Sequence, residues 1–328
     1  MRSTYRLRIV ALAFAALSLV SGLAVAQQAY PVKMIRFIVP FPPGGSLDPV
    51  ARLVGQKLAE SWGQTVIVDN RPGGNTVIGS EALVKSSPDG HTILLVGGST
   101  HLINSLLISH LPYDSIKDFA PIATLVRSEY LLALHPSVPA NNLQEFIALA
   151  KSQPGKLNYS SSGSGNLNHL AGEFFNMMAG VKLQHIPYKG GGPALIDLLS
   201  GQVQLQFNVP IGLAQHIRSG KLKAIAITGD SRAAILPLVP TFTEAGLPDF
   251  DLKSWQGVFA PAGTPKAVVD KLSSEMGRIL TMPDVREKLA SQGMEPYFST
   301  PEQFATLMNA ELAKFAKIIK AAGIKFEN

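Results

Sequence analysis

Short runs of β-branched and other apolar residues alternate along this chain with longer segments in which apolar residues recur every three or four positions. The first run, Ile35–Val39, is followed by such a segment at 50–58, which ends at Gly63. Short apolar runs are typical of buried strands, and the longer period is typical of amphipathic helices. Their regular alternation predicts an α/β fold with a mostly parallel sheet. Further strands are predicted at 66–68, 92–96, 131–134, 157–159, 183–186, 203–207 and 224–227.

Three dipeptides that contain proline predict where helices begin. Proline fits the first helical position, which places helix starts at Gly192-Pro193, Thr264-Pro265 and Thr300-Pro301. Thr300 and Gln303 have the spacing of a capping box, in which each side chain bonds the backbone of the other residue. The apolar face that follows predicts a long final helix ending near Gly323.

Residues 1–26 have the pattern of a secretory signal peptide. Three arginines and no acid precede an apolar stretch at 9–20, and the small residues at 24–26 fit a cleavage site. The alternative is a membrane anchor, because the apolar segment approaches the length that crosses a bilayer. Removal of these residues lowers the formal net charge from +6 to +3, since three of the 29 basic residues lie there. We therefore expect an exported protein, and the scattered basic residues that remain predict no nucleic-acid partner.

Composition and motif searches exclude several functional classes. The chain is 46% hydrophobic and 16% charged and has no cysteine, which excludes a disordered chain, a disulfide framework, thiol nucleophiles and iron–sulfur clusters. The histidines lack metal-binding spacing, and no Gly-rich loop is followed by a phosphate-binding lysine. No G-x-S-x-G motif of serine hydrolases is present. We therefore expect neither a metal nor a cofactor.

Four predicted strand-to-helix loops are rich in residues that leave backbone N–H groups accessible. They span 43–48, 97–100, 160–166 and 188–193. In open α/β sheets such loops gather at the carboxyl ends of the strands, where ligands bind, and the following helices add partial positive charge. Glycine and serine are also ordinary turn and capping residues, so one loop alone favours no ligand. Together the loops indicate an anion site, because three or four hydrogen bonds of about 1.5 to 3 kcal/mol each suffice for micromolar binding of a carboxylate.

Two single residues near these loops have two interpretations each. Asp48 can cap a helix ahead of Pro49, or it can hold the first loop so that its amides face the ligand; the proline behind it favours the cap. His169 lies shortly after the serine-rich loop and is the one histidine that we place near a ligand. It can equally be a polar helix residue bonded to a neighbouring carbonyl.

Ordered motifs along nearly the whole chain resemble a known family. They include VPFPPGGSLDPVARLV, LPYDSIKDFAPIATL, NYSSSGSGNLNHLAGEFF, HIPYKGGGPALIDLLSGQVQLQF and WQGVFAPAGTPKAVVDKL. In this order they resemble the substrate-binding proteins of tripartite tricarboxylate transporters, also called the Bug family. The resemblance implies a two-lobed periplasmic receptor of the type II binding-protein fold with a ligand cleft between the lobes. It places one lobe at 27–124 plus 252–328 and the other at 125–251, with crossings near 123–126 and 252–259.

The resemblance also implies a ligand, partners and contacts. The ligand is a small organic mono- or dicarboxylate, delivered by a monomeric receptor to a membrane permease or to a sensor kinase. Similar proteins grip one carboxylate through 43–46 and 160–166, with ordered water near 187–190 and the distal end of the ligand near Ser99. The predicted ligand-binding residues are Phe41, Pro43, Gly44, Gly45, Ser46, Asp48, Ser99, Thr100, Ser161, Ser162, Gly163, Asn166, His169, Tyr188, Gly190 and Asn208.

The chain departs from the family pattern at two positions. Asn208 stands where relatives often have Asp, which weakens the case for a ligand with an amino group. Leu47 stands where relatives often have a smaller residue, and we expect it to make the mouth of the cleft more apolar.

Two other functional classes stay open at this point. An exported hydrolase or transferase on a similar fold would use a serine of Ser160–Ser162 with His169, and it needs a base within hydrogen-bonding reach of the nucleophile. A pure interaction protein, such as a sensor co-receptor, would have a cleft blocked by side chains.

Overall fold

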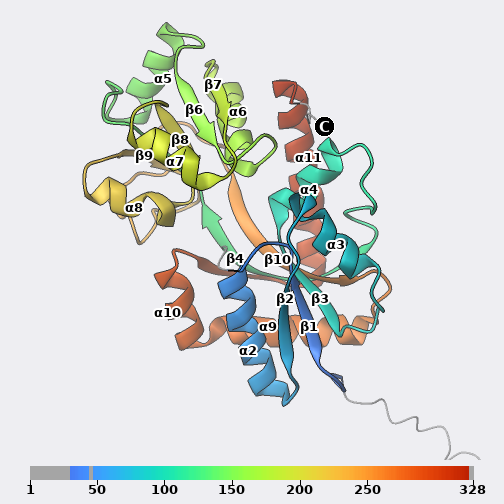
Figure 1. Ribbon diagram of the computed structural model, residues 1–328. Helices are drawn as coiled ribbons and strands as arrows, with labels where there is room; N and C mark the ends of the chain where they lie inside the picture. The colour runs from blue at the N-terminus through green and yellow to red at the C-terminus, as the bar shows by residue number, and fades with distance from the viewer. Residues whose placement is uncertain (1–29, 44–46, 325–328) are drawn as a thin grey trace, which may run out of the picture.

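The computed structural model describes residues 30–43 and 47–324, and it contains two β-sheets flanked by helices (Figure 1). The predicted signal peptide at 1–26 lies outside the described residues. So do three of the predicted ligand-binding residues, Gly44, Gly45 and Ser46.

The larger sheet has six strands in the order β11-β4-β10-β3-β1-β2. Its strands are β1 (Ile35–Val39), β2 (Val66–Asn70), β3 (Thr92–Gly97), β4 (Phe119–Glu129), β10 (Lys253–Pro261) and β11 (Glu295–Ser299). The helices around it are α2 (Asp48–Trp62), α3 (Val77–Val84), α4 (Gly98–Leu107), α9 (Lys266–Thr281), α10 (Pro283–Ser291) and α11 (Pro301–Ala322), with the short helix η2 (Gly74–Thr76). We call this the six-stranded part.

The smaller sheet has five strands in the order β7-β6-β8-β5-β9. Its strands are β5 (Leu131–Leu134), β6 (Asn158–Ser161), β7 (Gln184–Pro187), β8 (Leu205–Asn208) and β9 (Lys223–Ile227). The helices around it are α5 (Leu143–Ser152), α6 (Leu167–Ala179), α7 (Gly191–Leu199) and α8 (Pro210–Arg218). We call this the five-stranded part.

The predicted α/β class is confirmed, and both sheets are mixed. Strand β1 pairs in parallel with β2 and β3, and β6 pairs in parallel with β7 and β8. The pairings of β4, β5, β9, β10 and β11 are antiparallel. The expected predominance of parallel pairing therefore holds only within β1–β3 and β6–β8, because the strands that link the two parts enter their sheets in the opposite direction.

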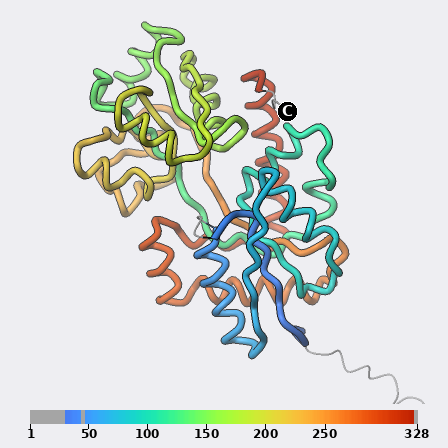
Figure 2. Tube along the Cα trace, viewed as in Figure 1, coloured from blue at the N-terminus to red at the C-terminus, as the bar shows by residue number. Residues whose placement is uncertain are grey.

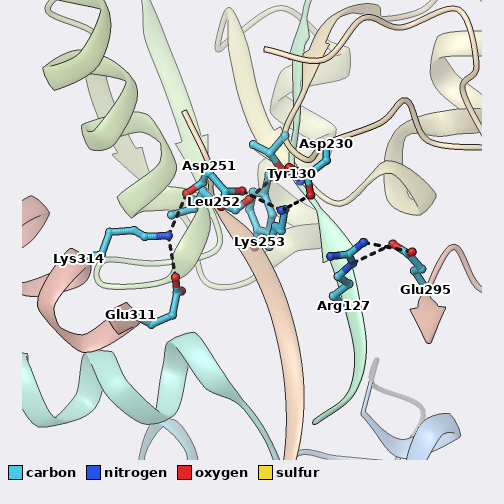
Figure 3. A network of polar contacts seen from close by, with 10 residues as sticks. Arg127, Tyr130, Asp230, Asp251, Leu252, Lys253, Glu295, Glu311 and Lys314 are labelled. Carbon is cyan, nitrogen blue, oxygen red and sulfur yellow. Dashed lines mark hydrogen bonds and ion pairs between the residues drawn. The ribbon is translucent and has the colours of Figure 1, made fainter. Parts of the chain in front are cut away.

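Two segments connect the parts, and one buried threonine bonds to both of them. The chain leaves the six-stranded sheet after Glu129 and returns to it at Lys253, which pairs with Glu129. Between these strands, Thr228 N donates to Tyr130 O and Thr228 Oγ1 accepts from Tyr130 N, each at 2.8 Å. Thr228 Oγ1 also donates to Leu252 O at 2.8 Å. Figure 2 shows the two connecting segments side by side, and Figure 3 shows the polar groups around them.

The C-terminal helix α11 packs against both parts. It lies against α4 and β4 of the six-stranded part and against α6 of the five-stranded part, as Figure 1 shows. Phe304 and Phe315 of α11 share one apolar core with Phe174 of α6. Near the connecting segments, Lys314 Nζ donates to Asp251 O at 3.1 Å (Figure 3). The core of the molecule is therefore continuous between the two parts along this helix.

The predicted helix ends match the structure to different degrees. The capping box of Thr300 and Gln303 is present, and Gly323 ends α11 in the left-handed conformation. Pro265 is the N-cap of α9 rather than its first residue, and Pro193 is the third residue of α7, whose N-cap is Gly190. The predicted start of α7 was wrong by two positions, because Gly191 and Gly192 already have helical backbone ahead of Pro193. The predicted start of α9 was wrong by one position, because Pro265 has a non-helical ψ of 134° and the helix begins at Lys266.

Candidate functional site

The loops predicted to bind a ligand lie at the edges where the two parts meet. In the six-stranded sheet, Gly97 at the end of β3 pairs with Gln256, close to the point where β10 enters that sheet. Because β1 and β2 run parallel to β3, the loops that follow them share this edge. In the five-stranded sheet, Asn208 at the end of β8 pairs with Leu131, the first residue after the connecting segment. The parallel β6 and β7 end at that same edge (Figure 1).

Asp48 is linked through Asn70 to the start of the first loop and does not cap α2. The N-cap residue is Leu47, and Asp48 is the first helical residue, so the cap interpretation was wrong. The Asp48 carboxylate accepts from Arg52 Nε at 2.9 Å and from Asn70 Nδ2 at 3.0 Å. Asn70 Nδ2 also donates to Phe41 O at 3.0 Å. One amide group at the end of β2 therefore joins the beginning and the end of the loop 41–48.

Leu47 does not lie at the mouth of a cleft. Its side chain is 6% exposed and packs with Val50 and Val54 in the core beneath α2. The expectation that it makes the cleft mouth apolar was wrong, because a leucine at the N-cap of an amphipathic helix can turn toward the sheet. Phe41 is half-buried and Pro43 is exposed on the described side of this loop.

Ser99 and Thr100 belong to the first turn of α4 and not to a loop. Ser99 is buried and Thr100 is half-buried. Gly98 begins the helix against the ring of Trp255, and a Cβ at Gly98 would overlap that ring. Glycine at 98 is therefore required for the helix to start this close to β10.

In the five-stranded part, the loop after β6 is bonded to the loop after β7. Tyr188 N donates to Ser161 O at 3.0 Å, and Gly190 N donates to Ser162 O at 3.2 Å. Gly163 has φ 139°, a conformation that favours glycine. The structure thus brings together Ser161, Ser162, Gly163, Tyr188 and Gly190, as the sequence predicts.

Two stacked histidines, His169 and His185, bond the loop that follows β6. The rings of His169 and His185 lie 3.7 Å apart at an interplanar angle of 7°. His169 Nδ1 accepts from Gly165 N at 3.0 Å, and His185 Nε2 lies 2.6 Å from Ser161 Oγ. Burial lowers the pKa of His169 to about 4, and burial together with neighbouring His169 lowers the pKa of His185 to about 3. Both rings are therefore neutral at pH 7, and His169 acts on the loop backbone.

The serine hydroxyl groups have partners other than His169. Ser160 Oγ donates to Ala194 O at 3.3 Å, and Ser162 Oγ donates to Asn168 Oδ1 at 3.2 Å. Ser161 contacts His185 but is fully buried. The serine and His169 pair that the hydrolase alternative requires is not formed among the described residues, because the acceptor nitrogen of His169 is bonded to Gly165.

Tyr188 and Asn208 make polar contacts within their own part. Tyr188 OH donates to Asp197 Oδ2 at 2.6 Å, and burial, with the bond to Asp197, raises the pKa of Tyr188 to about 12. Asn208 Oδ1 accepts from Val209 N at 2.8 Å, and its Nδ2 donates to Gln206 Oε1 at 3.3 Å. Asn208 therefore fixes the start of α8, which begins at Pro210.

A cavity of about 540 Å³ lies between the two parts. Its walls are the segment 231–235 and Pro210 on one side and the segment 286–296 on the other, with Glu129 between them. Burial raises the pKa of Glu129. Among the described residues that line this cavity, none is a predicted ligand-binding residue.

The structure adds residues that the sequence analysis missed. Asn70, Asn168 and His185 hold the predicted loops through their side chains. A signal was present at 73–76, where Gly-Gly-Asn-Thr follows a strand as in the four predicted loops. Within 30–43 and 47–324, no group of His, Asp or Glu side chains has the arrangement of a metal site. None of the helices in these ranges combines the length and apolar character of a membrane span.

Comparison with known proteins gives consistent matches. Residues 50–324 match the family model described as tripartite tricarboxylate transporter family receptor. The chain is 36% identical to Protein BugT of Bordetella pertussis over 304 residues, covering 92% of this chain and 93% of BugT. It is 38% identical to a UPF0065 protein of Pseudomonas sp. strain P51, covering 89% of this chain and 87% of that protein.

Solved structures match over similar lengths. An R. palustris protein solved with adipate has a TM-score of 0.78 at 33% identity, over 90% of this chain and 99% of that one. The periplasmic binding protein BugD has a TM-score of 0.74 at 33% identity, over 91% and 100%. MatC of Rhodopseudomonas palustris, solved with malate, has a TM-score of 0.74 at 32% identity, over 88% and 100%.

Proposed function

The chain belongs to the tripartite tricarboxylate transporter receptor family, and on this premise we propose that it captures a small organic mono- or dicarboxylate between its two parts. The family and its solved relatives are solute-binding proteins, so the chain is a solute-binding receptor and not an enzyme. The hydrolase or transferase alternative was therefore wrong. The ligand class rests on relatives solved with adipate and with malate.

The observation that carries the proposal is the position of the amide-rich loops. The strand ends before 41–48 and 98–100 face those before 162–166 and 188–190, and both sets lie beside the connecting segments. Backbone N–H groups and hydroxyls contribute about 1.5 to 3 kcal/mol each when they bond a charged group. A few of them suffice for a micromolar complex, so the proposed site needs no arginine. The sixteen predicted residues named above remain the proposed site, in which His169 and the fully buried Ser161 position the loop after β6 and the others contact the ligand.

We propose that the two parts are the lobes of the receptor and close by a hinge motion. The sequence predicts a second lobe at 125–251; we propose to move its first boundary to Tyr130, since β4 remains in the six-stranded sheet to Glu129, and to keep the second near Leu252, since β10 enters that sheet at Lys253. Thr228 is the proposed pivot, because its backbone and hydroxyl bond both connecting segments.

We further propose a periplasmic location, reached through cleavage of the predicted signal peptide, and a monomeric state. The family assignment supports a periplasmic receptor. A membrane permease of the tripartite type is the proposed recipient of the ligand, and a sensor kinase is the second candidate partner.

The test is calorimetric titration of protein that has been denatured and refolded to remove any carried ligand. Adipate, malate and hexanoate are suitable probes, and at least one carboxylate should bind with a dissociation constant near the micromolar range. Mass spectrometry of the compound released by denaturation identifies the natural ligand. A refolded protein that binds no organic acid, or one that releases only neutral solutes, contradicts the proposal and favours a pure interaction protein.

A further inference from the structure

A second loop at the edge of the six-stranded sheet has an unusual backbone. In the turn 73–76, which follows β2, the φ angles are 125° at Gly73, 55° at Gly74, 50° at Asn75 and 79° at Thr76. Left-handed backbone is readily adopted by glycine, but it is unfavourable for residues with a Cβ and most of all for a β-branched residue. Asn75 and Thr76 must therefore be held in this conformation by contacts from elsewhere.

Asn104 of α4 supplies those contacts. Its Nδ2 donates to Asn75 O at 2.7 Å and to Thr76 Oγ1 at 3.3 Å. Its Oδ1 accepts from Asn75 Nδ2 at 2.7 Å. Asn104 is 1% exposed and Thr76 is 2% exposed. Both ends of one buried amide group are thus used to fix two consecutive strained residues.

The turn lies beside the first proposed ligand loop. Gly79, in the helix that follows the turn, packs so closely that a Cβ there would lie 2.7 Å from the Cβ of Pro40. Asn70, at the end of β2, bonds the loop 41–48 directly. Gly73, Gly74 and Asn75 are exposed. The turn therefore lies at the same end of the sheet as the loop 41–48, with its glycines and Asn75 exposed.

Asn104 also links the turn to another proposed contact region. It lies four residues after Thr100 on α4, so the two side chains share a face of the helix. Thr100 belongs to the first turn of α4, where the distal end of the ligand is expected. The turn 73–76 and the first turn of α4 are thus held at a fixed spacing by one side chain.

We propose that the turn 73–76 contacts the distal carboxylate of a dicarboxylate ligand, and that Asn104 is the residue that positions this turn. The inference rests on the proposed function and adds a specificity element to it. Strained backbone persists only where its surroundings enforce it, and such positions concentrate at ligand sites. A turn locked before the ligand arrives costs no ordering entropy on binding, which favours the acid that reaches it.

The experiment compares adipate with hexanoate, which has the same number of carbons but one carboxylate. In Asn104→Ala, the dissociation constant for adipate should rise about tenfold, the effect of about one lost hydrogen bond, while that for hexanoate changes less than about threefold. Asn309→Ala is the matched control, since Asn309 is an exposed helical asparagine on α11 whose amide bonds Ala305 O. Both affinities should be unchanged in the control.

A double variant separates positioning from stability. Asn104→Ala/Thr76→Gly removes the Cβ that strains the turn, so it should recover the thermal stability lost in Asn104→Ala without recovering adipate affinity. If stability and affinity return together, Asn104 only stabilises the fold and the inference is overturned. Equal losses for adipate and hexanoate in Asn104→Ala also overturn it. A wild-type protein that binds none of adipate, malate and hexanoate contradicts the proposed function and the inference together, whereas normal binding of adipate in wild type and in Asn104→Ala contradicts the inference alone.

Discussion

The two edges that face each other in this molecule are held in different ways. In the five-stranded part, the loop after β6 is fixed by backbone bonds to the neighbouring loop and by the stacked rings of His169 and His185. In the six-stranded part, the loops after β1 and β2 are fixed by the amide side chains of Asn70 and Asn104. One edge therefore depends on imidazole groups, which take up a proton in acid, whereas the other depends on amide groups, which do not, together with the Asp48 carboxylate.

Lowering the pH should therefore destabilise the loops of the five-stranded part more than the loops of the six-stranded part. Neutral imidazole accepts a hydrogen bond from Gly165 N, and a protonated ring cannot accept it. The side-chain amide groups of Asn70 and Asn104 do not titrate themselves, and their bonds to Phe41 O and Asn75 O keep the same donor and acceptor at any pH at which the protein folds.

The largest effect is expected from acid itself. Folding lowers the pKa of His169 from 6.5 to about 4 and that of His185 to about 3. The unfolded chain therefore binds more protons below pH 6.5, so the stability from these neutral rings is complete above that pH and is lost as the pH falls toward 4. For His169 the loss is at most about 3 kcal/mol. Urea unfolding at pH 7 and at pH 5 measures it.

The control separates this effect from His101 of the six-stranded part, whose pKa burial also lowers to about 4. His169→Gln/His185→Gln should retain the pH dependence that His101 and the carboxyl groups of the half-buried Glu129 and the buried Glu311 cause, and should lose the part due to the two substituted rings. If this double variant loses as much stability between pH 7 and pH 5 as the wild type does, then His169 and His185 do not make the five-stranded part more sensitive to acid than the six-stranded part.

The next largest effect is expected from His169→Leu at neutral pH. The substitution leaves Gly165 N without its acceptor and removes the ring stack, so the free energy of unfolding should fall by about 2 kcal/mol. Because the loop at 162–166 then loses its support, the dissociation constants for adipate and hexanoate should both rise about tenfold or more. His135→Leu, at a partly exposed histidine that bonds Ser137, is the control. Unchanged affinity in His169→Leu would place the ligand away from this loop.

A smaller effect is expected from Asn70→Ala in the six-stranded part. The loop 41–48 loses the bonds to Phe41 O and to Asp48, and the free energy of unfolding should fall by about 1 kcal/mol. Both acids should bind more weakly, since this loop is proposed to hold the carboxylate that they share. If calorimetry finds that Asn70→Ala weakens the binding of adipate but not of hexanoate, then Asn70, like Asn104, positions a loop that contacts the distal carboxylate.

The smallest effect is expected from Arg52→Ala. The Arg52 side chain is 54% exposed although its partner Asp48 is buried, and because water screens the guanidinium we expect the pair to contribute about 1 kcal/mol. Asp48 keeps its bond from Asn70, so the adipate affinity should change less than about twofold. A loss as large as that of Asn70→Ala in the same titration would mean that the ion pair, and not the amide, fixes the first loop.

Most of the fold could be predicted because its strands carry local signals. Each predicted strand is present within about two residues of its observed bounds. Strands β4, β10 and β11 were missed for physical reasons that differ. Strand β4 contains Pro121, β10 is buried on both faces from Trp255 onward and has no alternation, and the half-exposed β11 contains Pro296. Strands β4 and β10 connect the two parts, and β11 is the outermost strand of the larger sheet next to β4.

The loops of the candidate site could be predicted, but the residues that fix them could not. Glycine and serine after a strand are a local signal, whereas Asn70 bonds a carbonyl 29 positions earlier, and Asn104 bonds one that is equally distant. His185 lies on a strand, and only the fold stacks it on His169. Asp48 was misassigned because a proline in the first turn is compatible with either residue before it as the cap.

The final helix has a consequence for the proposed hinge motion of the two parts. Since α11 contacts α4 and β4 of the six-stranded part and α6 of the five-stranded part, the proposed hinge motion would slide apolar side chains past one another at one of these contacts. Apolar side chains that interlock resist such sliding until they change rotamers together. We therefore expect the packing of α11 to oppose the proposed hinge motion, separately from any contact that the loops make with a ligand.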